Sequence, residues 1–183
     1  IQRQLNIPTI LVTHDQEEAL SISDRIAVMY GGKIEQLDTP HNIYYAPQTR
    51  FVAAFIGNMN FLGGDVCATQ ALMLHASETV LNHPHRLPTG TAFEIGFRPE
   101  NAVLSTTCPV DVQGLVIQVR PMHTEFLGAK KRIFCQMLAK NAQTIDLQVD
   151  IEHQNTLQLN DEMWLSVTSQ HLYLFDEAGR VRC

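Results

Sequence analysis

The residues with the clearest potential for chemistry are Thr13, His14 and Asp15, a polar triplet that directly follows an apolar run. Residues 9–12 read Thr-Ile-Leu-Val, the continuous β-favouring pattern of a strand covered on both faces in a parallel sheet. Ligands of open α/β sheets bind in the crevice outside the carboxyl ends of such strands. A histidine at that place can donate a hydrogen bond to a phosphate oxygen, although a histidine at a strand end is, by itself, more often structural. The pattern therefore makes His14 a candidate phosphate ligand.

Candidate metal ligands elsewhere in the sequence are too scattered to form a site. His83 and His85 flank Pro84, but no cysteine or carboxylate cluster accompanies them. The cysteines, none of them in a Cys-x-x-Cys pair, are Cys67, Cys108, Cys135 and Cys183. We therefore expect no metal site, and we expect the two histidines to be structural or exposed to solvent. The cysteine pattern fits a protein of the reducing cytoplasm.

The balance of charged and apolar residues excludes two classes of partner. The 183 residues carry a formal net charge of −6 and no cluster of lysine or arginine, whereas a nucleic-acid backbone requires a concentrated basic face. No apolar run approaches the roughly 20 residues of a membrane-spanning helix. With 45% apolar residues, the chain can form one core of ordinary size or two small ones. We expect a globular protein that binds no nucleic acid and meets the membrane only through a partner.

Helices and short strands alternate in the N-terminal third of the chain. The expected elements are a helix at 15–22, strands at 24–30 and 33–37 joined by Gly31 and Gly32, and helices at 40–45 and 48–56. Asp15 and Glu18 have the spacing of a capping box, and Thr39-Pro40 has that of a helix start. Gly57 supplies a stop for the last helix. We expect the apolar face of that helix to contain Phe51, Val52, Phe55 and Ile56.

The first turn of the helix at 15–22 contains Gln16, Glu17 and Glu18. Acidic residues are favoured there by the helix dipole. We expect all three side chains to be solvated and to have no catalytic role.

Beyond Asn58 the helical periodicity fades and short β-rich runs follow one another. These runs lie at 93–97, 114–119, 131–137, 144–149 and 163–167. Turn residues separate them, which is typical of a small barrel or sandwich with a domain boundary near 58–64. We expect Phe126, Leu127 and Trp164 in its core.

Arg98, Pro99 and Glu100 follow the first of these runs. Pro99 should end the strand, since it cannot donate to a β-ladder. Arg98 could pair with Glu100 or with a partner's carboxylate. We favour a structural turn with an exposed ion pair of little energetic weight over a ligand site.

Residues 8–62 resemble the end of the nucleotide-binding domain in ABC importer ATPases of the sugar, iron, polyamine and phosphonate type. Residues 12–19, Val-Thr-His-Asp-Gln-Glu-Glu-Ala, resemble the switch-histidine loop of that family. The likeness continues in register at 24–29, 32–34, 39–40, 43–44, 47 and 51–57. The remainder resembles, more loosely, the family's regulatory domain of small OB-type barrels (TOBE domain), at 94–101, 125–128 and 171–176.

The resemblance implies a fold class in two parts. Residues 1–57 would be the α/β tail of a P-loop-type nucleotide-binding domain, and residues 58–183 an all-β OB-like regulatory domain. His14 would be both the catalytic and the cofactor-binding residue, contacting the γ-phosphate of ATP and helping to hold the attacking water in line.

The family's phosphate-binding loop, its signature motif and its acidic strand are missing from the sequence. We therefore expect a C-terminal fragment of an ATP-hydrolysing subunit. ATP and Mg²⁺ would serve the full-length subunit, while the fragment alone would have no cofactor and no activity. The resemblance also implies a homodimer that docks on inner-membrane permease subunits, at the cytoplasmic face of the membrane.

Two other interpretations remain open at this point. One is a stand-alone OB-like module that binds an oxyanion, a metal or another small ligand. The other is a nucleic-acid-binding barrel, although single-strand binding calls for aromatic residues interleaved with lysine and arginine. The transported solute cannot be read from the sequence, because the resemblance places selectivity in other subunits.

Overall fold

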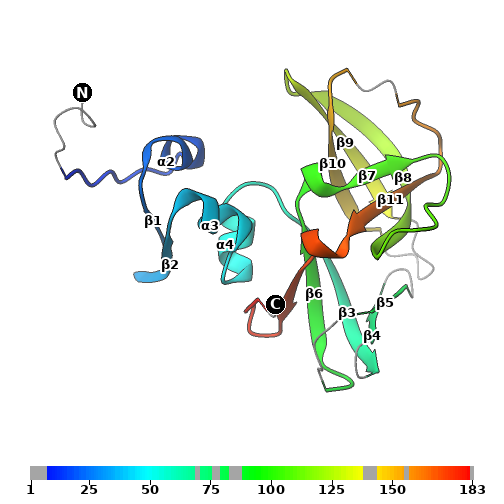
Figure 1. Ribbon diagram of the computed structural model, residues 1–183, viewed down its shortest axis with the longest axis horizontal. Coiled ribbons are helices and arrows are strands. Elements are labelled where there is room, and N and C mark those ends of the chain that lie inside the picture. Colours follow the sequence, from blue (N-terminus) through cyan, green and yellow to red (C-terminus); the bar gives the residue numbers. More distant parts are fainter. Residues whose placement is uncertain are drawn as a thin grey trace.

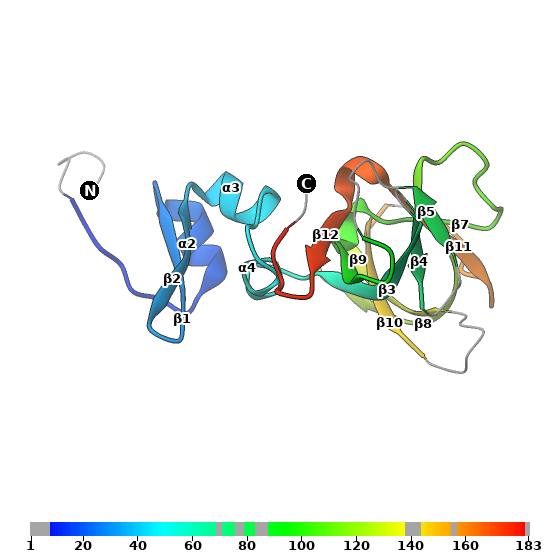
Figure 2. The same ribbon diagram turned by 90° about the horizontal axis from the view of Figure 1, so that it is seen from below.

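The computed structural model describes residues 8–68, 71–75, 79–82, 88–137, 144–154 and 157–181. The helices and a β-hairpin of the N-terminal third lie at one end of the molecule, and two larger sheets lie at the other (Figures 1 and 2). The C-terminal strand returns toward the helices, between the two ends. His83 and His85 lie outside the described residues.

The N-terminal part forms almost as expected. It contains α2 (Gln16–Ile22), β1 (Ile26–Tyr30), β2 (Lys33–Asp38), α3 (Pro40–Tyr45) and α4 (Arg50–Phe55). β1 and β2 pair antiparallel across Gly31 and Gly32, whose positive φ angles of 56° and 77° favour glycine. Thr39 caps α3, and Thr49 caps α4. The elements enclose a small apolar cluster of Ile26, Val28, Ile43, Val52 and Ile56.

The predicted helical face at 48–56 is only partly right. Val52 and Ile56 belong to the small apolar cluster, and Phe51 packs against it. Phe55 is exposed instead, and its ring stacks on Phe51. The helix also starts later than predicted, at Arg50.

The predicted strand at 9–12 is wrong for this chain. Residues 8–13 have no regular secondary structure, and 94% of Ile10 and 92% of Val12 are exposed. A strand gains its stability from neighbouring strands, and none lies beside these residues in the described part of the chain.

Of the two interactions that the predicted capping box requires, the one made by the side chain of Asp15 is present and the one made by Glu18 is not. Asp15 Oδ1 accepts hydrogen bonds from the backbone N–H groups of Glu17 at 3.0 Å and Glu18 at 3.1 Å, so Asp15 is the N-cap of α2. The backbone N–H of Asp15 donates to Thr13 Oγ1 at 3.0 Å rather than to Glu18. Thr13 therefore replaces Glu18 as the second capping group.

Two antiparallel sheets form the larger part of the molecule. The strands are β3 (Asn60–Ala68), β4 (Ala71–Leu74), β5 (Val80–Asn82), β6 (Ala92–Phe97), β7 (Val103–Ser105), β8 (Gly114–Phe126), β9 (Lys130–Met137), β10 (Asp146–Glu152), β11 (Met163–Thr168) and β12 (Tyr173–Asp176). One sheet has the order β10-β9-β8-β11-β7, and the other has the order β12-β6-β3-β4-β5. A single apolar core, with Leu62, Ile95, Leu115 and Leu165 among its members, joins the inner faces of both sheets. We call this unit the barrel.

The five predicted β-runs are strands β6, β8, β9, β10 and β11. Strand β3 was not predicted, because Gly63, Gly64 and Asp65 are weak strand formers. Its pairing depends on Gly64, where an added Cβ would lie 2.4 Å from Met73 O and 2.5 Å from Phe93 Cζ. Only glycine allows this close approach of strands and rings.

Three predicted core residues lie elsewhere. Phe126 and Leu127 are 67% and 43% exposed, because the far end of the β8–β9 hairpin extends beyond the core. Trp164 is half-buried, on the face of β11 opposite the buried Leu165. The core positions on β8 are Leu115, Ile117 and Val119.

Candidate functional site

The candidate phosphate ligand His14 lies in the bend directly before α2 and is exposed to solvent. The carboxylate of Asp15 is turned toward the first N–H groups of α2. Asp15 therefore orients the start of the helix, and the imidazole is left accessible to a group from outside the described residues. Glu17 and Glu18 are exposed, as predicted.

Helix α2 rests on the small apolar cluster through Ala19 and Leu20, which are only partly buried. Gln16 adds a polar link. Its Oε1 accepts a hydrogen bond of 2.8 Å from the backbone N–H of Gly57, just past the end of α4. The prediction that Gln16 is a solvated residue is therefore wrong: it joins the helix next to His14 to another part of the fold.

Arg98 is fully buried, with 0% of its surface exposed, so the predicted exposed ion pair is wrong. The residue follows β6, and its guanidinium reaches into the N-terminal part of the molecule. Nη1 lies 3.1 Å from Ala53 O, 2.6 Å from Ile56 O and 3.0 Å from Asn58 O. Nη2 donates to Tyr44 O at 3.1 Å. Arg98 thus connects the barrel to α3, to the last turn of α4 and to the segment after it.

The guanidinium of Arg98 satisfies a helix end. The last carbonyl groups of an α-helix have no partners within the helix, and a cation there also complements the helix dipole. Ala53 O would ordinarily accept from the N–H of Gly57, but that N–H donates to Gln16. Arg98 supplies the missing donor. Desolvation on burial lowers the pKa of Arg98 from its usual value.

The ring of Tyr44 covers the guanidinium of Arg98, with 4.2 Å between Cζ and the ring centroid. The hydroxyl of Tyr44 donates to Glu100 Oε1 at 2.5 Å. Burial, together with this hydrogen bond, raises the pKa of Tyr44. The predicted partner of Arg98, Glu100, is thus bound by Tyr44 instead. Pro99 does end β6 and begins a single 3₁₀ turn, as predicted.

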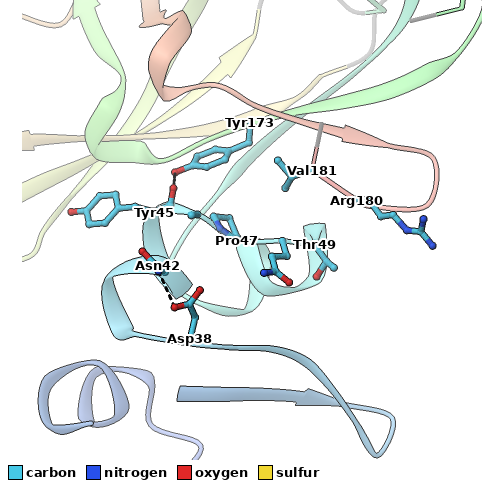
Figure 3. Close-up of a pocket in the computed structure, with 10 residues that line it drawn as sticks. Asp38, Asn42, Tyr45, Pro47, Thr49, Tyr173, Arg180 and Val181 are labelled. Atoms are coloured by element: carbon cyan, nitrogen blue, oxygen red, sulfur yellow. Dashed lines mark hydrogen bonds between the residues drawn. The ribbon is translucent and has the colours of Figure 1, made fainter. Parts of the chain in front are cut away.

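A cleft of about 720 Å³ opens beside this junction (Figure 3). Its walls come from the end of β2, from α3, from the turn before α4 and from the C-terminal residues: Asp38, Asn42, Tyr45, Ala46, Pro47, Gln48, Thr49, Tyr173, Arg180 and Val181. Tyr173 OH donates to Tyr45 O at 3.1 Å across it. Asn42 Nδ2 donates to Asp38 Oδ1 at 2.8 Å, which lowers the pKa of Asp38.

Nothing in this cleft resembles a catalytic arrangement. Arg180 points away from Asp38 in Figure 3, and no nucleophile lies beside a general base among the labelled side chains. The cleft was not predicted from the sequence, because its lining residues come from two stretches, 38–49 and 173–181, that lie far apart in the chain.

A buried charge cluster lies on the barrel. The side chain of Asp150 is 2% exposed and accepts hydrogen bonds from Lys130 Nζ at 2.5 Å, Arg132 Nε at 2.7 Å and Arg132 Nη2 at 2.8 Å. Desolvation raises the pKa of Asp150, but the bonds from Arg132 and Lys130 outweigh it and lower the pKa below the usual value. Both oxygens of the Asp150 carboxylate are therefore bonded, which fits a structural role.

Two further features bear on function. The described residues contain no group of three or more histidine, cysteine, aspartate or glutamate side chains placed to hold a metal ion. Among the described residues, no helix combines the length and the apolar character needed to cross a membrane.

Proteins similar in sequence to this chain are import ATP-binding proteins. The chain is 37% identical over 191 residues to the spermidine/putrescine import ATP-binding protein PotA of Frankia alni, covering 97% of the chain and 41% of that protein. It is 32% identical over 181 residues to the sn-glycerol-3-phosphate import ATP-binding protein UgpC of Chromohalobacter salexigens, covering 98% and 47%. It is 32% identical over 189 residues to the Fe(3+) ions import ATP-binding protein FbpC 2 of Rhizobium meliloti, covering 97% and 47%. The chain thus spans less than half the length of these relatives. It matches no protein-family model.

The barrel is similar in structure to a small binding protein. The cytoplasmic molybdate-binding protein ModG, solved with molybdate bound, superposes with a TM-score of 0.52 and 9% sequence identity, over 63% of this chain and 94% of ModG. At this identity the likeness shows the fold alone. It confirms the predicted OB-like architecture of the β-rich part.

Proposed function

Since this chain belongs to the same family as the ATP-binding subunits of ABC importers, we propose that it is the C-terminal part of such a subunit and serves ATP-driven solute uptake. Residues 1–57 would complete a nucleotide-binding domain, and residues 58–183 would form its regulatory domain. The observation that carries the proposal is alignment over 97% of the chain to a subunit of this kind. The division is supported by the separate apolar cores on either side of Asn58.

His14 would donate a hydrogen bond to the γ-phosphate of ATP in the complete subunit. Phosphoryl transfer depends on charge stabilisation and positioning, so one donor aimed at the phosphate is a sufficient role for this residue. The structure fits it, because the imidazole is exposed at a helix start whose N-cap, Asp15, is already bonded to the backbone. ATP and Mg²⁺ would otherwise be held by residues outside this sequence. Mg²⁺ would neutralise charge on the phosphates.

The partners follow from the same proposal. Two copies of the subunit would pair, and each would dock on a membrane permease subunit at the cytoplasmic face of the inner membrane. The relatives are import proteins for a polyamine, for glycerol 3-phosphate and for Fe(3+). Because these cargoes differ so widely, the chain's own cargo is left unassigned.

The test is the ATPase activity of the complete subunit with His14→Ala. We expect kcat to fall by about 100-fold or more, the usual effect of removing one donor to the transition state. His123→Ala is the matched control, because His123 is an exposed histidine on β8 of the barrel. It should leave kcat unchanged. Full activity of His14→Ala would refute the role proposed for His14.

A binding experiment separates this proposal from the alternative of a stand-alone small-ligand module. Calorimetric titration of the chain by itself with molybdate, sulfate and Zn²⁺ should show no tight binding. A dissociation constant in the micromolar range or below for any of the three would favour the alternative.

A further inference from the structure

One peptide group lies between the barrel and the helix that begins beside His14. The carbonyl of Ile56 and the N–H of Gly57 belong to the same planar peptide unit. The N–H donates to Gln16 Oε1 at 2.8 Å, and the carbonyl accepts from Arg98 Nη1 at 2.6 Å. Gln16 on α2 and Arg98 on the barrel therefore hold this peptide from its two opposite ends.

The same peptide lies close to Tyr44 and to Arg98. Gly57 has a φ of 71°, which favours glycine, and a Cβ at this position would lie 3.0 Å from Tyr44 Cε2 and 3.3 Å from Arg98 Nη1. A side chain at this position would therefore have to displace the ring or the guanidinium, so Gly57 lies close to both groups. Both are anchored to the barrel side, since Tyr44 OH binds Glu100 and Arg98 follows β6.

The bond from Arg98 to the carbonyl of Ile56 is buried, and the bond from the N–H of Gly57 to Gln16 is partly buried. Bonds in series through one peptide polarise each other, because its donor and acceptor are conjugated. A change in the angle between the barrel and α4 would rotate the peptide and lengthen the bond to Gln16. Gln16 lies two residues from His14, at the same end of α2.

We propose that Gln16 is a positioning residue through which the barrel, acting by way of Arg98 and the Ile56–Gly57 peptide, sets the position of His14. We call this path the Gln16–Arg98 relay. The proposal rests on the function proposed above for His14. It gives the regulatory domain a direct way to act on the ATPase site: a partner or effector that turns the barrel changes where His14 lies.

The first test is made on the chain itself, without nucleotide, by NMR measurement of amide hydrogen exchange at Gly57. Gln16→Met keeps the length of the side chain and removes the acceptor, so exchange at Gly57 should accelerate by about tenfold or more. Gln16→Glu keeps an acceptor oxygen, so exchange at Gly57 in this variant should stay as slow as in the parent chain. Glu17→Gln, at the exposed neighbouring position, is the control and should have no effect. Unchanged exchange in Gln16→Met would overturn the relay.

The second test asks whether Arg98 and Gln16 act together. Arg98→Lys keeps the charge but loses the planar pair of donors. If this variant does not fold, Tyr44→Phe is used instead, because it weakens the same junction more mildly. Either variant should shift the amide signals of α2, and combining it with Gln16→Met should add little further. Additive effects, or α2 signals that do not move, would overturn the proposal.

The third test uses the complete subunit. Gln16→Met should lower kcat for ATP hydrolysis by about tenfold and change KM for ATP by less than about twofold, because a positioning role affects the reacting geometry more than binding. Gln16→Glu should recover most of kcat. If exchange at Gly57 responds as expected but His14→Ala is fully active, the relay stands and the proposed function fails. If His14→Ala is inactive while Gln16→Met keeps full kcat, the relay fails and the proposed function stands.

Discussion

Replacing Arg98 with methionine should destabilise the chain by about 3–5 kcal/mol. Methionine fills a similar volume but has no donor, so four carbonyl oxygens, those of Tyr44, Ala53, Ile56 and Asn58, lose a hydrogen bond at a buried junction. A buried polar group left without a partner costs about 1–3 kcal/mol. Because methionine carries no charge, the variant also avoids several kcal/mol of desolvation cost, which brings the net loss of stability to about 3–5 kcal/mol. The loss is a large fraction of the roughly 5–15 kcal/mol that a domain has.

The assay is urea unfolding followed by far-ultraviolet circular dichroism and by the fluorescence of Trp164, the single tryptophan. Arg120→Met is the matched control. The side chain of Arg120 is 52% exposed, and its pairing with Glu162 is long, at 4.0 Å, so the change should stay within about 0.5 kcal/mol of the parent. The loss of unfolding free energy in Arg98→Lys should lie between the losses in Arg98→Met and Arg120→Met. A loss below about 1 kcal/mol in Arg98→Met would show that the guanidinium does not hold the junction together.

Further predictions concern the buried charge cluster and the thiols. Asp150→Asn should cost about 3–5 kcal/mol in urea unfolding, because it leaves two cations without their buried partner. Folding lowers the pKa of Asp150, so its carboxylate stabilises the folded protein above about pH 4, the usual pKa of an aspartate. Acid titration of the parent should show this stabilisation disappearing as the pH falls through the pKa that Asp150 has in the folded protein. Burial raises the pKa of the Cys135 thiol to about 12, so a thiol reagent at pH 8 should modify the exposed Cys108 within minutes and Cys135 only after unfolding. Mass spectrometry of the digested protein distinguishes the two, and prompt native modification of Cys135 would contradict its burial.

The sequence predicted best where the signal is local. The caps Asp15 and Thr39, the Gly31-Gly32 turn and the stop at Gly57 depend on a few neighbouring residues, and each is found in the structure. The short β-rich runs between turn residues also predicted their strands, and in β8 every second residue from Leu115 to Val119 is buried.

The sequence predicted least well where a residue depends on distant parts of the chain. Arg98 stands 42 residues from Ile56, and its local sequence of Arg-Pro-Glu favours an exposed turn. Gln16 has the setting of an ordinary first-turn residue, and its partner Gly57 lies 41 residues away. The strand at 9–12 failed for a related reason: its pattern requires flanking strands, and the described residues supply none.

We propose that His14 contacts the terminal phosphate of ATP in the complete subunit. The most direct measurement is the ¹H–¹⁵N spectrum of the histidine side chains in the complete subunit, with His14→Ala used to assign the signal of that ring. Addition of a non-hydrolysable ATP analogue with Mg²⁺ should shift the His14 signal, and ADP should leave it nearly in place, because only the analogue carries a γ-phosphate. A His14 signal that responds equally to both nucleotides, or to neither, would contradict the account.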